Sequence, residues 1–180
     1  MPDVNQTEIS LPDYIAKDLR ILSVGLNPSL PSVEKGFYFA NPRNRFWKAF
    51  NQAELIDRPL VPNNQVHQIL LENYSIGFTD VVKRPSRMGH ELRVDDFKRD
   101  APKLREKLER YQPRLIWFHG KVAMGKFMQY GFGLKQTWKW GLNDIKQLDA
   151  KIYVTPNPSP ANAAYSLDDL ITSYKPLIDV

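Results

Sequence analysis

Short apolar runs alternate with longer stretches of mixed polarity along the 180 residues of the chain. Four of the runs are apolar at most positions, a pattern typical of strands that are buried on both faces of a sheet. A fifth run, at 144–148, shows the pattern more weakly. The sequence therefore predicts strands at 20–25, 75–80, 114–119 and 151–155, with a weaker candidate at 144–148.

The stretches between these runs have the spacing of helices. Leu104, Leu108 and Tyr111 recur on one face of the longest of them. Gln112-Pro113 ends this helix, because the residue before a proline disfavours helical backbone. We expect helices at 44–53, 65–73, 95–111, 121–130 and 166–177, and a long loop rich in aromatic residues at 30–43.

Strands that alternate with helices imply crossover connections and a parallel sheet with helices on both faces. The pattern predicts an α/β protein, a three-layer α/β/α sandwich with a mainly parallel four-stranded central sheet. The length fits one hydrophobic core. We expect an N-terminal extension at 1–19 and a single domain at 20–180.

Two of the loops that follow predicted strands contain Asn-Pro. Asn27-Pro28-Ser29 follows the first strand, and Asn157-Pro158-Ser159 follows the last. Asn-Pro is also ordinary turn chemistry. In a parallel sheet, however, both loops lie at the carboxyl edge, where α/β proteins bind their ligands. Asn27 and Ser159 are therefore candidates to face one cleft.

The net charge of +5 is unevenly distributed. Between residues 83 and 126 there are 13 basic and 6 acidic residues, so the excess of positive charge lies in the middle of the chain. Such a region suits a polyanion, because cations that neutralise phosphates drive nucleic-acid binding. Much of it also fits the solvated face of the long helix, with pairs such as Glu106 and Arg110.

The chain contains no cysteine, and this excludes disulfides, thiolate metal sites, cysteine-bound iron–sulfur clusters and thiol nucleophiles. The three histidines, His67, His90 and His119, do not have the spacing of metal ligands. We expect His119 to form a local hydrogen bond. The sequence predicts no metal and no cofactor, and no membrane segment. We expect a cytoplasmic protein, associated with the nucleoid if the source is a prokaryote.

The stretch GLNPSLPSVEKGFYFANPRNRFWKAF resembles the first motif of the mismatch-specific uracil and thymine DNA glycosylases, a branch of the uracil-DNA glycosylase superfamily. That motif reads G-I-N-P-G-L, a short spacer, then G-F-x-F-A-x-P-x-N-R-F-W, and only Leu26 and Ser29 depart from it here. The run TDVVKRP at 79–85 and PNPS at 156–159 resemble later parts of the same family. The resemblance covers residue 20 to the C-terminus.

This resemblance implies a monofunctional glycosylase that hydrolyses the N-glycosidic bond of uracil, and also thymine or other damaged pyrimidines, in double-stranded DNA with G:U or G:T mismatches. Asn27 would position the water, and the target base would be flipped into a pocket. Lys48 is more typical of a solvated charge than of a lyase nucleophile. The resemblance implies a base pocket formed by Leu26, Phe37, Phe39, Ala40 and Asn44.

The second motif departs from the family pattern N-P-S-G-L-S-R. Pro160 and Ala161 replace the Gly-Leu pair whose leucine fills the gap left by a flipped base, and Tyr165 or Asn162 are candidates to replace it. We expect this loop to enter the DNA through Asn157, Ser159, Pro160, Ala161 and Asn162.

Several basic residues follow strand ends on the expected cleft side. We expect phosphate contacts from Arg84, Arg87, Lys121 and Lys126, and a monomer in solution. Two alternatives remain open: a glycosylase of the same superfamily for hypoxanthine or xanthine, and a DNA-binding protein that keeps the fold without catalysis.

Overall fold

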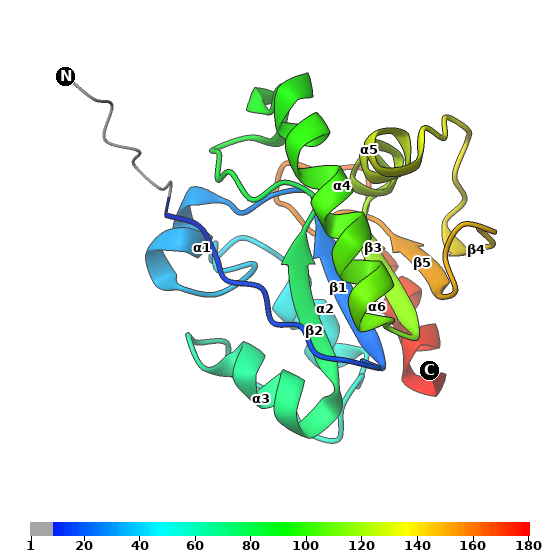
Figure 1. Ribbon diagram of the computed structural model, residues 1–180. Helices are drawn as coiled ribbons and strands as arrows, with labels where there is room; N and C mark the ends of the chain where they lie inside the picture. Colours follow the sequence, from blue (N-terminus) through cyan, green and yellow to red (C-terminus); the bar gives the residue numbers. More distant parts are fainter. Residues whose placement is uncertain (1–8) are drawn as a thin grey trace.

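A five-stranded sheet forms the centre of the computed structural model, which describes residues 9–180 (Figure 1). The strand order is β2-β1-β3-β5-β4. Four strands are parallel, and the edge strand β4 is antiparallel to β5. The strands are β1 (Ile21–Gly25), β2 (Ile76–Asp80), β3 (Leu115–His119), β4 (Gly141–Asn143) and β5 (Lys151–Thr155).

The predicted α/β/α sandwich with a mainly parallel sheet is confirmed, and the prediction of four strands is wrong by one. The fifth strand is also not where the weak pattern placed it, since β4 precedes 144–148. β4 is only three residues long and its central Leu142 is exposed, so it carries no buried apolar run. An antiparallel edge strand of this kind leaves little trace in a hydrophobic pattern.

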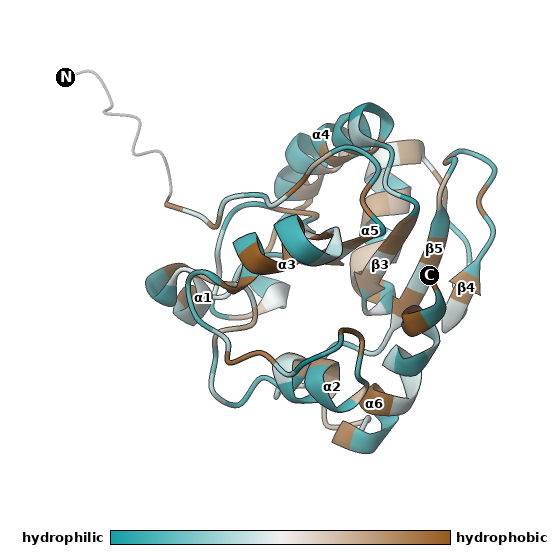
Figure 2. Ribbon diagram, turned by 90° about the horizontal axis from the view of Figure 1, so that it is seen from below, coloured by the Kyte–Doolittle hydropathy of each residue, from teal (hydrophilic) through white to brown (hydrophobic). Residues whose placement is uncertain are grey.

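Helices cover both faces of the sheet. In β1, Ile21 packs against one layer, while Leu22 and Val24 pack against the other. Figure 2 shows hydrophobic residues on β3 and β5 between the layers and hydrophilic residues along much of α4. The first layer holds α2 (Phe46–Gln52), α3 (Val66–Tyr74) and α6 (Leu167–Tyr174), and the second holds α4 (Val94–Tyr111) and α5 (Lys121–Phe132).

The expected loop at 30–43 begins with a helix, α1 (Leu30–Lys35). Ser29 caps this helix, because its side chain accepts a hydrogen bond from the Ser32 amide at 3.2 Å. Gly36 ends it in the left-handed conformation, with φ of 77°. Two 3₁₀ helices, η1 (Gly89–Glu91) and η2 (Lys175–Asp179), complete the elements, and η2 replaces the last turn of the helix predicted at 166–177.

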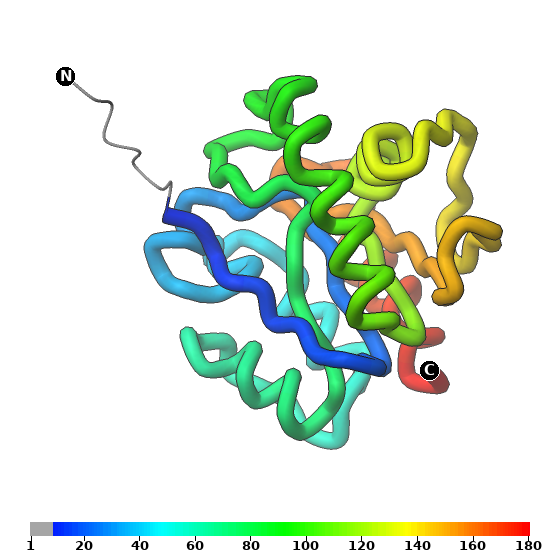
Figure 3. The backbone as a smooth tube through the Cα atoms, in the orientation of Figure 1, coloured from blue at the N-terminus to red at the C-terminus, as the bar shows by residue number. Residues whose placement is uncertain are grey.

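The segment before β1 packs against the outer edge of the sheet. Tyr14 and Phe78 exchange two backbone hydrogen bonds of 2.9 Å in an antiparallel bridge. Asp13 binds Lys83 at 2.9 Å and also forms an ion pair with Lys107 of α4. Figure 3 shows this segment running alongside β2. The described part of the expected extension, 9–19, is thus tied to the sheet, while its first eight residues lie outside the described residues.

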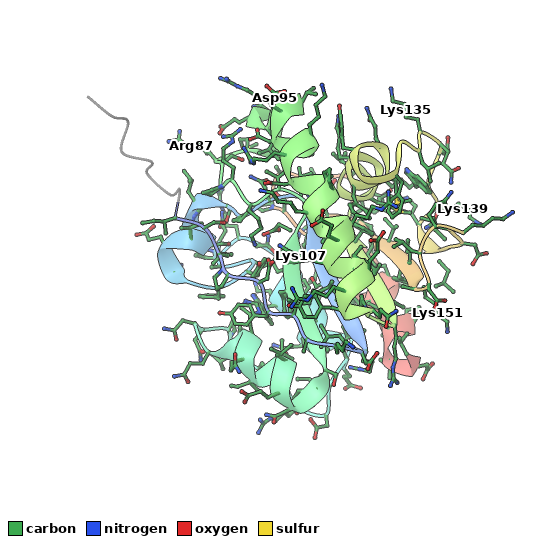
Figure 4. The ribbon with its side chains drawn as sticks, viewed as in Figure 1. Arg87, Asp95, Lys107, Lys135, Lys139 and Lys151 are labelled. Atoms are coloured by element: carbon green, nitrogen blue, oxygen red, sulfur yellow. The ribbon has the colours of Figure 1, made fainter. Side chains whose placement is uncertain are left out.

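The parallel strands all end at one edge of the sheet, and the loops of interest gather there. In Figure 4, Arg87 lies toward this edge, whereas Lys151, the first residue of β5, lies toward the opposite end. None of the helices in residues 9–180 combines the length and apolar character needed to cross a membrane.

Candidate active site

A cavity of about 560 Å³ opens at the carboxyl edge of the sheet. This volume lies in the range of sites for small ligands. Asn27 and Ser159 both line the cavity, so the two Asn-Pro loops meet there, as their positions after parallel strands predict. The ends of β2 and β3 add Asp80 and His119 to its walls.

Asn27 is held in one orientation by its amide nitrogen. Nδ2 donates to the Arg84 carbonyl at 3.0 Å and to Ser86 Oγ at 2.8 Å, which uses both of its hydrogens. Ser86 Oγ in turn donates to the Met88 carbonyl at 2.8 Å. Within the described chain, Oδ1 of Asn27 accepts no hydrogen bond, so it remains free to accept one from a water in the cavity.

Phe39 offers an aromatic surface inside the same cavity. Its ring stacks on the ring of Phe46, with centroids 4.1 Å apart and planes 21° apart. The rings of Phe39 and His119 form an edge-to-face pair with centroids 5.0 Å apart. The backbone of Phe39 has φ of 58°, which a bulky residue rarely adopts. Such strain persists only where the surroundings enforce it, and it is frequent at functional sites.

The other residues predicted for the base pocket divide into two groups. Leu26 and Asn44 line the cavity, and Asn44 Oδ1 accepts from the Phe46 amide at 2.9 Å, which leaves its amide nitrogen as a donor. Phe37 and Ala40 do not line it. Phe37 packs against the core, and the Ala40 amide donates to Ser32 Oγ at 3.2 Å, so these two support the loop.

Arg45 fastens the second motif to the first. Its guanidinium donates to three backbone carbonyls of the loop after β5, those of Ser159 at 3.1 Å, Asn162 at 2.9 Å and Tyr165. The Arg45 amide donates to the Pro158 carbonyl at 3.1 Å. A planar guanidinium with several fixed donors suits this task. Sequence reasoning treated Arg45 only as part of a motif and missed this role.

The loop after β5 is also closed by its own side chains. Asn157 Oδ1 accepts from the Ser159 amide at 2.9 Å, and Asn162 Nδ2 donates to the Asn157 carbonyl at 3.0 Å. Four of the five predicted residues line the cavity, and Pro160 is exposed outside it. The four that line it are Asn157, Ser159, Ala161 and Asn162.

The four predicted phosphate-binding cations have different surroundings. Arg87 and Lys121 line the cavity. Arg84 forms hydrogen bonds of 3.0 and 2.7 Å to both carboxylate oxygens of Asp96, which lower the pKa of that carboxyl to about 2. Lys126 lies over the ring of Phe97 at 5.3 Å and is not part of the cavity wall. Arg87 and Lys121 are therefore the better placed pair.

An aromatic cluster lies at the mouth of the cavity, and of its members only Trp140 was not predicted as part of the site. Trp140, 41% exposed, meets Tyr165 edge to face at 5.4 Å, and Lys121 Nζ lies 4.5 Å from the centre of the Trp140 ring. All three residues line the cavity. The WKW run at 138–140 was the available signal, and the structure buries Trp138 while it exposes Trp140.

His119 forms the local hydrogen bond that the sequence analysis expected. Its Nε2 lies 2.7 Å from Ser23 Oγ. Burial lowers the pKa of His119 to about 3, so the ring is neutral at physiological pH. In the part of the chain that the structure describes, no group of three or more His, Asp or Glu side chains is arranged to hold a metal ion.

The sequence profile of the uracil DNA glycosylase superfamily matches residues 12–176. The chain belongs to the uracil-DNA glycosylase superfamily. The solution NMR structure of a proposed uracil DNA glycosylase from Methanosarcina acetivorans is similar, with a TM-score of 0.59 and 25% sequence identity over 94% of this chain and 98% of that one. Membership of the uracil-DNA glycosylase superfamily implies a DNA glycosylase, a hydrolase of N-glycosidic bonds in DNA.

Proposed function

We propose that the protein is a monofunctional DNA glycosylase that removes uracil, and also thymine, from mismatches with guanine in double-stranded DNA. The observation that carries this proposal is the presence of the free Oδ1 of Asn27 and the ring of Phe39 in one cavity. Phosphate binding needs neither group, so their combination favours catalysis over a purely DNA-binding role. The protein acts as a monomer, with water as the second substrate.

The chemistry follows from the properties of the bond. Hydrolysis passes through a sugar with oxocarbenium character, while the departing pyrimidine takes up negative charge. The target base leaves the duplex and enters the cavity, where its π-face stacks on Phe39. Asn27 Oδ1 accepts one hydrogen of the attacking water and fixes its position. An amide is a very weak base, so Asn27 contributes positioning, and the released proton needs another acceptor.

The DNA surface surrounds the mouth of the cavity. Arg87 and Lys121 supply positive charge there for the phosphates beside the flipped nucleotide. Ala161 is too small to fill the gap left in the base stack. Trp140 and Tyr165, at the same mouth, present aromatic surface for that task.

Cleavage assays on defined duplexes test the function. The protein is incubated with duplexes that carry a single U:G, T:G, U:A or hypoxanthine:T pair, and the strands are examined before and after alkali. We expect breaks at U:G sites only after alkali, because Lys48 is exposed and away from the cavity and forms no Schiff base. Asn27→Ala lowers the activity strongly, while Asn73→Ala, which replaces an exposed asparagine on α3, retains it.

The atypical second motif favours one alternative, a superfamily glycosylase that prefers hypoxanthine or xanthine. Greater cleavage of the hypoxanthine:T duplex than of the U:G duplex would establish it. Binding that weakens with salt, with no cleavage of any duplex, would reduce the protein to a DNA-binding role.

A further inference from the structure

The cavity contains a carboxylate that the proposed reaction has not used. Asp80 is the last residue of β2, is 4% exposed and lines the cavity. Within residues 9–180 its side chain accepts no hydrogen bond, and its Oδ2 is fully buried. A buried carboxylate without hydrogen bonds is costly, and each such group in a folded protein calls for an explanation.

The backbone makes room for this carboxylate beside the Asn27 loop. Asp80 pairs in register with Gly25 of β1, two residues before Asn27. A Cβ atom on Gly25 would lie 2.6 Å from Asp80 Oδ1, so any residue larger than glycine would push the carboxylate away. Gly25 lines the cavity together with Asp80 and Asn27.

The charges around Asp80 are only partly balanced. Lys83 Nζ lies 3.9 Å from Oδ2, beyond hydrogen-bond distance, and is shared with Asp13 at 2.9 Å and the Tyr38 hydroxyl at 3.1 Å. Lys107 approaches from α4, but it pairs with Asp13. The cavity wall adds the cations Arg87 and Lys121 and the neutral ring of His119. Burial raises the pKa of Asp80 to about 7, against the opposing effect of Lys83.

We propose that Asp80 is the general base of the glycosylase reaction, an inference that rests on the proposed function. The water held by Asn27 Oδ1 forms a bond to C1′ as the bond from C1′ to the base nitrogen breaks, and the electron pair leaves with the base. The proton of the water passes to Oδ1 of Asp80, because Oδ2 is fully buried. The departing base takes a proton from solvent, and Asp80 returns its own to solvent after turnover.

His119 is another titratable residue of the cavity wall with an unpartnered atom, and it is poorly suited to the role of general base. Its Nδ1 is buried without a partner in the described structure, while Nε2 is engaged with Ser23. A pKa of about 3 makes it a far weaker base than a carboxylate whose pKa lies near neutrality.

Single-turnover excision of uracil from a U:G duplex, measured across the pH range in which Asp80 ionises, tests the inference. We expect the wild-type rate to rise with pH and level off above about 7. Asp80→Asn lowers the rate on the plateau by about 10²- to 10⁴-fold and flattens the pH profile. Asp80→Ser is a second variant that lacks the carboxylate. Asp95→Asn, which replaces an exposed aspartate on α4, is the matched control.

Two further variants separate the base from its surroundings. Asn27→Ala lowers the rate but retains the pH profile, because Asp80 is intact. Gly25→Ala displaces the carboxylate and resembles Asp80→Asn. Binding of a duplex with a tetrahydrofuran abasic analogue, measured by fluorescence anisotropy, stays at the wild-type level in Asp80→Asn.

Three results would overturn the inference while the proposed function stands: a wild-type rate in Asp80→Asn, a slower variant that keeps the wild-type pH profile, or a loss explained by weaker binding. A wild-type protein that cleaves no duplex is a different outcome, since it contradicts the proposed function itself.

Discussion

The attachment of the second motif to Arg45 is open to a direct test by Arg45→Ala. The substitution removes three hydrogen bonds from a charged donor to backbone carbonyls at 159, 162 and 165. Hydrogen bonds to charged groups contribute about 1.5–3 kcal/mol each. Two effects reduce the total: the carbonyls gain water when the side chain is absent, and Nε of Arg45 is already buried without a partner in the described structure.

The three hydrogen bonds sum to about 4.5–9 kcal/mol, and with both reductions we expect the free energy of unfolding to fall by about 3 kcal/mol. For a chain of this size, this corresponds to a decrease of about 6–12 °C in the melting temperature. Arg45→Lys is intermediate, because an ammonium is a single charged centre and cannot reproduce the planar set of donors. Arg43→Ala is the control, since Arg43 is exposed two residues away.

Thermal unfolding followed by circular dichroism measures the stability, and hydrogen exchange measures the loop. Amides within 157–165 are expected to exchange faster in Arg45→Ala than in wild type, while amides of β1 and β3 change far less. If Arg45→Ala melts together with Arg43→Ala and the loop exchanges at the wild-type rate, the attachment described here is not what holds the second motif.

Three further predictions concern the mouth of the cavity, the sheet edge and a buried charge. Trp140→Ala weakens binding of a U:G duplex more than Trp140→Phe does, as measured by anisotropy, because the ring at the mouth is lost. Gly77→Ala lowers the melting temperature strongly, because a Cβ atom there would lie 2.3 Å from the Tyr14 carbonyl oxygen. In the control Gly133→Ala the new Cβ meets no atom within 4 Å, so the melting temperature should fall less despite the positive φ of Gly133. Folding raises the pKa of Asp80 from 3.8 to about 7, so the stability that the protonated carboxyl contributes is fully present below pH 3.8 and is lost as the pH rises through 7. Urea unfolding should therefore show that Asp80→Asn is more stable than wild type at pH 8, and the difference should disappear toward pH 4.

The strands that were predicted well are those whose signal is local. β1, β2, β3 and β5 are buried over nearly their whole length, so their apolar runs mark them within one residue. β4 and α1 were missed for physical reasons. β4 gains its strand conformation from pairing with β5, and α1 contains Pro31 and depends on the cap that Ser29 provides.

The site shows the same division between local and non-local signals. Asn27 and Phe39 lie in a motif long enough to be recognised, and the structure places both in the cavity. Asp80 carries no such signal, because its character comes from burial in the cavity wall and from a neighbour, Gly25, that is 55 residues away in the sequence. Phosphate contacts were predicted from charge and from position after strand ends, and neither reveals that Arg84 is bound to Asp96.

The way in which Arg45 holds the second motif determines which side chains this loop can carry. The guanidinium binds main-chain oxygens, and every amino acid provides one at that position. The path of the loop is therefore insensitive to which side chains it carries. Pro160 and Ala161, which depart from the family pattern, therefore leave the scaffold of the loop intact, and the loop can carry different side chains while Asn27 and Phe39 keep their places in the cavity.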